Sequence, residues 1–258
     1  SDKDFLIKGN DGGSTITALT FDMSAAGAAT FNDKIVATEL DISGDVDIDG
    51  TLETDAITLN GTSFIKIEGT NFTDSLLVGH ATTGTLSSAE DNTGVGIGAL
   101  DALTSGTDNT ALGQDAATLL TTGSHNVFIG STAGSQATDM QGCIGIGSSA
   151  LGSADPGNNN IAIGESAGLN ITGVRNLCIG ENAGDNITSG SGNVIIGSAV
   201  DPSSATGDRQ LLIAGNDGST TTTWISGDNS GNLTFAADVT LGDDLHLDSD
   251  AAVLKFGD

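Results

Sequence analysis

Residues 160–168 read Asn-Ile-Ala-Ile-Gly-Glu-Ser-Ala-Gly, and residues 176–184 read Asn-Leu-Cys-Ile-Gly-Glu-Asn-Ala-Gly. The same phrase recurs, with substitutions, through residues 91–200. The glycines that end its Ile-Gly pair align as Gly98, Gly113, Gly130, Gly147, Gly164, Gly180, Gly197 and, in a degenerate copy, Gly215. The steps between them are 15, 17, 17, 17, 16, 17 and 18 residues. A period near 17 residues is too short for helical-pair repeats or propeller blades, and it is typical of one coil of a β-solenoid.

Two columns of aliphatic residues accompany the glycines. One residue before the glycine stand Ile97, Leu112, Ile129, Ile146, Ile163, Ile179 and Ile196, and three residues before it stand Val95, Thr110, Val127, Ile144, Ile161, Leu177 and Val194. Positions two apart share one face of a strand, so we expect these side chains to fill the interior of the solenoid. The position between them is mostly small or apolar (Gly96, Ala111, Phe128, Gly145, Ala162, Cys178 and Ile195). We therefore expect further copies of the chain to cover this second face.

An asparagine column stands four residues before the glycine. Its members are Asn109, Asn126, Asn160, Asn176 and Asn193, and its departures are Gly94 and Cys143. Stacked amides can hydrogen-bond from coil to coil, so we expect a structural ladder and not a ligand site. A flexible Gly/Ala/Ser/Thr-rich linker is the alternative interpretation, but linkers do not hold isoleucine in register over successive repeats.

These phrases resemble the Asn-Thr-Ala-Ile-Gly repeats of trimeric phage and virus tail fibres, and more distantly the β-roll head repeats of trimeric autotransporter adhesins. The resemblance covers about residues 91–200. It implies an all-β fold in which each protomer forms a left-handed parallel β-roll, a β-solenoid of about seven to eight coils, with three protomers around one axis. Residues 44–55, Gly-Asp-Val-Asp-Ile-Asp-Gly-Thr-Leu-Glu-Thr-Asp, are similar to segments that precede such rolls in tail fibres of marine phages.

The rest of the chain reads as small β modules. Phe5-Leu6-Ile7 leads into Gly-Asn-Asp-Gly, and Leu211-Leu212-Ile213 leads into Ala-Gly-Asn-Asp-Gly, while Phe235 matches Phe31. This pattern predicts an internal duplication that brackets the β-roll. We therefore divide the chain into an N-terminal β module (1–40), a strand-rich shaft and junction (41–90), the β-roll (91–200) and a C-terminal β module (201–258).

Composition excludes several classes of function. The chain of 258 residues has 38 Gly, 3% aromatic residues and a formal net charge of -27. An excess of carboxylates argues against nucleic acid and anionic membranes as partners. No apolar run is long enough to span a bilayer. The chain begins at Ser1, and we expect it to be part of a longer protein.

Motifs for catalysis, cofactors and metals are not evident in the sequence. Residues 45–50, Asp-Val-Asp-Ile-Asp-Gly, resemble the start of a calcium loop, but Ala56 stands where its bidentate glutamate should be, so a solvated strand face is favoured. His80, His125 and His246 lie far apart. Cys143 and Cys178 fall in different columns two coils apart, about 10 Å by strand spacing, too far for a disulfide. We expect no enzyme, no cofactor and no metal site.

The functional expectation is a structural and attachment protein: a segment of a homotrimeric phage or virus tail fibre, in the virion and outside the cell, that spaces or presents a receptor-binding tip. The expected partners are the chain itself, other fibre or virion proteins and a host-cell receptor. Two alternatives stay open, the head or stalk of a bacterial surface adhesin and a polysaccharide depolymerase on a β-helix. Receptor contact is expected where the repeat is broken, at residues 139–142, at residues 155–159 and near His80 and Asp201.

Overall fold

The computed structural model describes residues 3–22, 28–31, 57–59, 62–69, 71–79, 83–152 and 155–239. Their regular elements are all strands, so the part of the chain that is described is all-β. It holds no helix long and apolar enough to cross a membrane. The chain divides into two compact units, residues 1–53 and 54–258.

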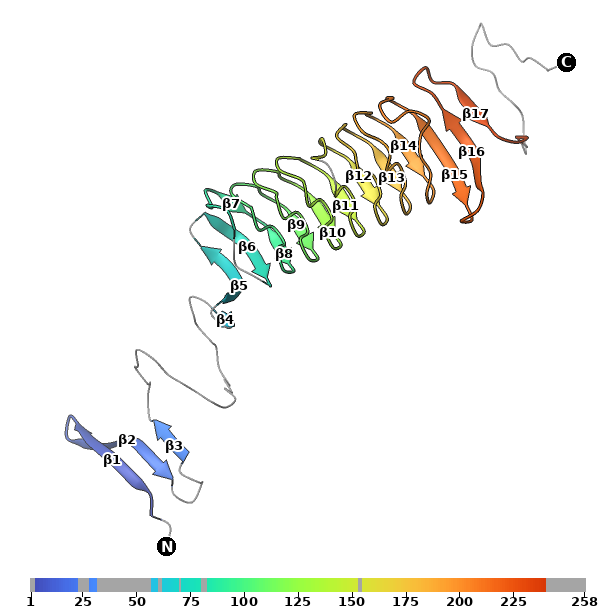
Figure 1. Ribbon diagram of the computed structural model, residues 1–258. Coiled ribbons are helices and arrows are strands. Elements are labelled where there is room, and N and C mark those ends of the chain that lie inside the picture. The colour runs from blue at the N-terminus through green and yellow to red at the C-terminus, as the bar shows by residue number, and fades with distance from the viewer. Residues whose placement is uncertain are drawn as a thin grey trace, which may run out of the picture. The chain divides into compact units, whose positions relative to one another are not determined.

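The larger unit is a β-solenoid whose coils stack along one axis, as Figure 1 shows. Its parallel sheet comprises β6 (Phe72–Val78), β8 (Thr93–Val95), β9 (Thr110–Leu112), β10 (Val127–Ile129), β11 (Ile144–Ile146), β12 (Ile161–Ile163), β13 (Leu177–Ile179), β14 (Val194–Ile196) and β15 (Leu211–Asn216). A short strand, β7 (Ala89–Glu90), pairs with the start of β6. Paired residues are 17 apart at every step except Ile161–Leu177, where they are 16 apart, which gives about eight coils.

The strand pairing corrects the alignment at both ends of the repeat. Val95 pairs with Leu112, so the first coil ends its phrase at Gly96 and not at Gly98. At the other end Ile213 pairs with Ile196, so the equivalent residue is Ala214 and not Gly215. The first and last steps were wrong by two residues and one residue because each true position has a glycine close by.

The inside and the outside of the coil are also the reverse of the sequence-based assignment. Within each three-residue strand the middle side chain is buried, and the two flanking side chains are partly or largely exposed. Phe128, Ala162, Cys178 and Ile195 are therefore in the core, whereas Ile163 is 37% exposed. The prediction that Ile129, Ile146, Ile163, Ile179 and Ile196 fill the interior is wrong. The coil is narrow, so the column with mainly small side chains faces inward.

The core is completed by the turn that follows each strand. Leu100, Ala117, Gly134, Leu151, Gly168 and Gly184 occupy one position of this turn, and all six have φ between 50° and 60°. Their volumes complement the strand residue that they face. Gly134 leaves room for the ring of Phe128, and a Cβ on Gly94 would meet Leu100. In the coils of Gly94, Phe128 and Gly145 a glycine at one of the two positions thus makes room for a large side chain at the other.

Backbones of successive coils touch at the glycine column. Gly96, Gly113, Gly130, Gly147, Gly164, Gly180 and Gly197 have φ between 130° and 141°. A Cβ at Gly113 would strike the carbonyl of Gly130, and the other members make the equivalent contact with the next coil. Only glycine combines this φ with such a close approach. At Ala214 no further coil follows, and a side chain is tolerated.

Antiparallel strands extend the sheet at both ends of the solenoid. β4 (Ile57–Leu59) and β5 (Thr62–Gly69) precede β6, and β16 (Thr221–Gly227) and β17 (Leu233–Phe235) follow β15. In the smaller unit β1 (Phe5–Asp11), β2 (Ser14–Asp22) and β3 (Ala28–Phe31) form a separate antiparallel sheet. The expected strands and carboxylates of residues 41–56, His80, His246 and the tail after residue 239 lie outside the described residues.

Because Phe128 and Gly134 share one space in the core, two changes that each destabilise the protein alone should compensate one another when they are combined. Phe128→Gly should destabilise the fold by about 3–5 kcal/mol, as large-to-small core changes do. Gly134→Leu alone should also destabilise, because its Cβ would meet the Phe128 ring. Together the two changes reproduce the Gly145 and Leu151 combination found one coil later, so the double variant should be more stable than either single variant. Urea denaturation measures all three. Additive losses would contradict the pairing.

Candidate functional site

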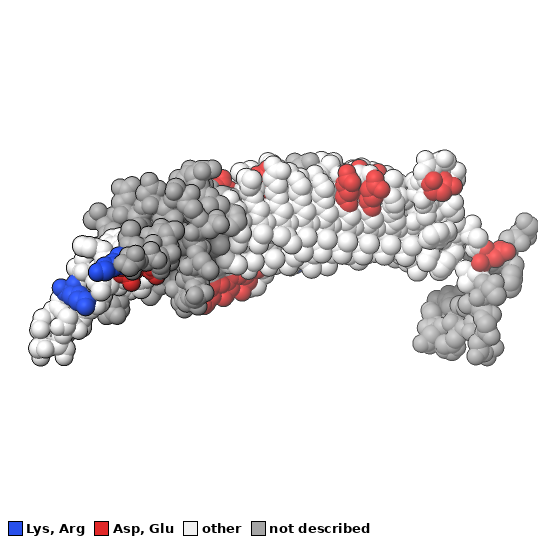
Figure 2. All heavy atoms as spheres, turned by 90° about the horizontal axis from the view of Figure 1, so that it is seen from below, with Lys and Arg blue, Asp and Glu red and all other residues white. Residues whose placement is uncertain are grey.

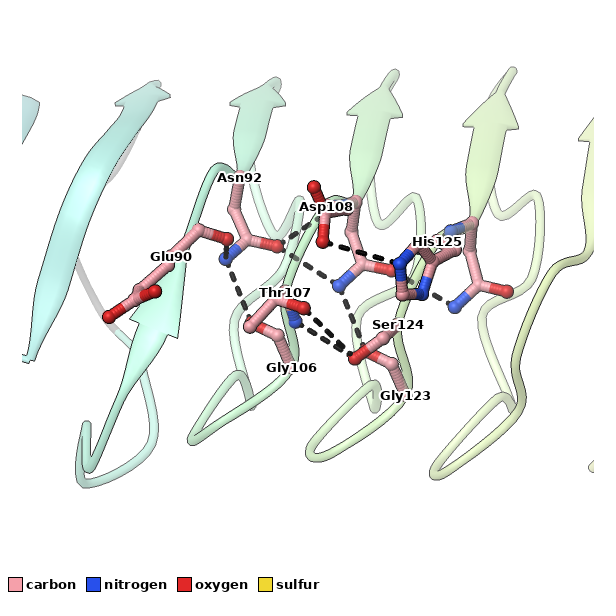
Figure 3. A network of polar contacts seen from close by, with 10 residues as sticks. Glu90, Asn92, Gly106, Thr107, Asp108, Gly123, Ser124 and His125 are labelled. Atoms are coloured by element: carbon pink, nitrogen blue, oxygen red, sulfur yellow. Dashed lines mark hydrogen bonds and ion pairs between the residues drawn. The ribbon is translucent and has the colours of Figure 1, made fainter.

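The asparagine column forms a ladder with one direction, part of which appears in Figure 3. The Oδ1 atom of Asn92 accepts hydrogen bonds from the backbone N–H and the side-chain Nδ2 of Asn109, at 3.1 and 3.0 Å (Figure 3). The Nδ2 of Asn92 donates to the carbonyl of Gly106 at 2.9 Å. Asn109 repeats these contacts with Asn126 and Gly123. Each amide therefore connects its own coil to both neighbours.

The same pattern continues through Asn160, Asn176 and Asn193. All three are buried, and the later amides take their acceptor from the preceding Oδ1 at 3.0–3.1 Å. Ser75 supplies the acceptor for the backbone N–H of Asn92 at one end, and Gln210 donates its own N–H to Asn193 at the other. Asn92 was missed from the sequence, where Gly94 was assigned to this column. Fixing the true phrase end at Gly96 identifies it.

Cys143 replaces asparagine at one position of the ladder. Its N–H donates to Oδ1 of Asn126 at 2.9 Å, and its Sγ accepts from the N–H of Asn160 at 3.4 Å. The same Sγ lies 3.3 Å from the carbonyl of Gly157, to which the thiol donates. Nδ2 of Asn160 has no side-chain acceptor here and turns to the Gly157 carbonyl at 2.6 Å. The thiol keeps the ladder continuous with weaker hydrogen bonds.

Because these amides find partners in neighbouring coils, the ladder has a structural role. A buried polar group without a partner costs free energy, and a ligand would have to replace bonds that already exist. The ladder also fixes register, since a slip by one residue would break contacts in every coil.

The outer face of the parallel sheet is the more promising site of interaction. We call it the outer face, and it consists of two ladders: Thr93, Thr110, Val127, Ile144, Ile161, Leu177, Val194 and Leu211, and Val95, Leu112, Ile129, Ile146, Ile163, Ile179, Ile196 and Ile213. None of these residues is buried in the single chain. Every side chain is aliphatic or threonine, and none is charged. A continuous apolar surface on this scale is typical of a protein interface.

The antiparallel extension at the C-terminal end keeps the same two faces. Ile225 pairs with Ile213 and Phe235 pairs with Ile225, so the outer face continues over β16 and β17. Its exposed members include Trp224, 55% exposed, and Phe235, 49% exposed. The inner side chains change from apolar to polar: Thr221, Thr223, Ser226 and Thr234 line one cavity together with Leu212. Beyond the last coil the inner face of the sheet therefore becomes polar, and the outer face stays apolar.

Charge is sparse along the solenoid. On the side drawn in Figure 2, acidic side chains form a few separate patches, and long stretches between them are uncharged (Figure 2). Nε2 of His125 lies 3.5 Å from Oδ2 of Asp108 on the neighbouring coil, and both side chains are exposed (Figure 3). Within the described parts of the chain, no three His, Cys, Asp or Glu side chains gather in a way that would hold a metal ion.

The breaks in the repeat, where receptor contact was expected, hydrogen-bond to the preceding coil. The carboxylate of Asp155 accepts from the N–H and Oγ1 of Thr138, at 3.0 and 2.8 Å. Oδ1 of Asn158 accepts from the N–H of Gln141 at 2.8 Å. Pro156 between them is buried. These turns therefore cap the preceding coil, and receptor contact there is still a prediction.

The junction at Asp201 borders a cavity of about 610 Å³ at the last coil. Burial raises the pKa of the Asp201 carboxyl, the hydrogen bond from the N–H of Asn186 lowers it, and the neighbouring Asp185 carboxylate raises it. Burial also raises the pKa of the Cys143 thiol, and it raises that of Cys178 to about 12. Both cysteines are free and buried. They are therefore poor nucleophiles at neutral pH.

Comparison of the chain with protein-family models, with characterised proteins and with solved structures finds no match.

Completing the ladder should stabilise the protein. Cys143→Asn supplies an Oδ1 acceptor for Asn160 and an Nδ2 donor for Asn126 and Gly157, as in the other coils. We expect a gain of about 1 kcal/mol, the usual net worth of an internal hydrogen bond. Cys143→Ala should instead lose about 1–3 kcal/mol, because the N–H of Asn160 loses its acceptor. Denaturant unfolding compares the two, and a loss in both would mean that the site does not accept an amide.

Asp201 should make stability depend on pH. Since its folded pKa is raised, its contribution is fully present below the unfolded pKa and declines as pH rises through the folded pKa. Asp201→Asn keeps an oxygen acceptor for Asn186 and removes this decline. The variant should melt at a higher temperature than the wild type at pH 7, with the difference vanishing below the ordinary Asp pKa of about 3.9. A difference that persists at low pH would point to packing and not to charge.

Proposed function

We propose that this chain is a structural segment of a homotrimeric phage or virus tail fibre, which spaces or presents a receptor-binding tip outside the cell. The observation that carries the proposal is the outer face. It is apolar from β8 to β15 and over the antiparallel strands that follow, where the opposite side of the sheet becomes polar. Such selective retention of apolar side chains is expected of a face that is buried by other chains.

Self-association is the simplest way to bury this surface. Copies of one chain around an axis bring the same ladders together along the whole solenoid, so every coil contributes equally. The similarity of the phrases to fibre and adhesin repeats favours three copies and a left-handed coil. Self-association would also add to the apolar area that a chain with few aromatic residues can bury, because the outer Ile and Val side chains would fill the space between chains.

A passive shaft fits the polar parts of the molecule as well. The asparagine ladder is satisfied internally, and the turns at Asp155 and Asn158 hydrogen-bond to the preceding coil. The stalk or head of a bacterial trimeric adhesin would have the same construction. The two functions differ in where the chain is found, on virus particles or on the bacterial surface.

The trimer can be tested by changing the two faces separately. Ile163→Asp places a carboxylate on the outer face, so the trimer should dissociate or fail to assemble while each coil keeps its core. Ala162→Asp places the same charge inside the coil and should prevent folding. Gln136→Asp, at an exposed turn, is the control and should do neither. Light scattering with circular dichroism reads both properties, and a folded wild-type monomer would end the proposal.

The biological setting needs a separate experiment. Gold-labelled antibodies against the purified chain should decorate fibres on virus particles in electron micrographs. Labelling of uninfected bacterial surfaces would instead identify an adhesin. Purified protein incubated with capsular polysaccharides should release no reducing sugar, and release would establish the depolymerase alternative.

A further inference from the structure

The N-terminal sheet has the same pairing as the sheet that ends the solenoid. Ile7 pairs with Leu19 and Leu19 with Phe31, just as Ile213 pairs with Ile225 and Ile225 with Phe235. A bulge follows Ile7 in one sheet and Ile213 in the other. Both hairpins then turn at Asn-Asp-Gly. The two sheets therefore correspond residue by residue, with β1, β2 and β3 equivalent to β15, β16 and β17.

The two faces correspond too. Residues that line the inner, polar side at the C-terminal end are Thr221, Thr223, Ser226 and Thr234. Their equivalents in the N-terminal sheet are Thr15, Thr17, Thr20 and Thr30. On the other side, Phe5 and Phe21 lie with their ring centroids 6.0 Å apart. The N-terminal sheet thus has the apolar and polar sides of a sheet that ends a solenoid.

One neighbour distinguishes the two sheets. β15 pairs in parallel with β14, through Val194 with Leu211 and Ile196 with Ile213. β1 pairs only with β2 among the strands that the structure describes, while β3 and β17 are the last strands of both sheets. The exposure of side chains follows: Leu6 is 42% exposed and Ile7 46%, whereas the equivalent Leu212 packs against the core cluster. Among the described strands, β1 is therefore an open edge at the position where β15 meets a coil.

We propose that β1 is an acceptor edge for the terminal coil of a second β-solenoid with this 17-residue repeat, which pairs with it in parallel as β14 pairs with β15. Open strand edges are templates for a further strand, and the pairing pattern selects which strand fits. Leu6 would enter the core of that coil as Leu212 does, and Phe5 and Ile7 would continue its outer face. The fibre would then alternate solenoids with antiparallel sheets.

Lys8 is the departure from this correspondence, since Ala214, its equivalent, is buried at 3% exposure. At this position the glycine column ends and no further coil collides with a side chain. A lysine there needs a path for its ammonium group to water. The effect of the Lys8 side chain on pairing must therefore be distinguished from the ability of the β1 backbone to pair.

A transplant within the full chain tests the proposal, and β14 serves as the strand with which β1 should pair. Residues 5–31 replace residues 211–235, which adds two residues to the turn between the second and third strands. One version keeps Lys8 and the other carries Lys8→Ala. In at least one version, amides of β14 should keep hydrogen-exchange protection within about tenfold of the wild type, as a paired strand does. Loss of more than about a hundredfold in both versions would overturn the proposal.

Leu6→Asp gives a matched control, because the residue has different surroundings in its two locations. In the transplant it should abolish protection of β14, since Leu6 then faces the core in place of Leu212. At its native position it should leave β14 and the melting temperature unchanged. If the wild-type chain already protects β1 amides in a concentration-dependent way, the occupant is an edge of a second copy and the proposal is wrong.

Discussion

Close contact between peptide groups of successive coils is the constraint on which the other features depend. A side chain at the glycine column would strike the next coil, so the glycines at 96, 113, 130, 147, 164, 180 and 197 set the stacking distance. That distance is also the one at which an asparagine amide reaches both neighbouring coils. Backbone contact and side-chain ladder thus enforce one register, and each supports the other.

The narrow coil explains how side chains are distributed. A three-residue strand can direct only one side chain inward, and the turn opposite supplies the rest of the core. The flanking Ile and Val side chains of each strand, which fit a pleated surface, then lie outside, whereas Ile195 at a middle position is buried. This leaves the Ile and Val columns on the outer face, so the packing inside a coil and the apolar surface outside it depend on different columns of the same repeat.

The period, the strands and the columns could be predicted from the sequence because each repeats in phase. The face could not, because Ile is the better core residue by hydropathy, and only the width of the coil shows that Phe128 with Gly134, or Gly145 with Leu151, already fills it. The ends were misplaced because Gly98 and Gly215 lie close to the true positions, Gly96 and Ala214. The middle copies of a repeat can be aligned reliably with a copy on each side, but the first and last copies have only one neighbour to align with.

The ends of the solenoid show how such a rod is terminated. A parallel coil exposes backbone groups at its last strand, and β15 satisfies them by pairing with β14 on one side and with antiparallel β16 on the other. The inner face becomes threonine and serine because there is no further coil to enclose it, while the outer face stays apolar. Large exposed apolar patches of this kind are typical of interaction surfaces. The change in polarity is therefore independent of the repeat itself, and it separates the two roles of the sheet: its inner side builds the protomer, and its outer side is available to join protomers.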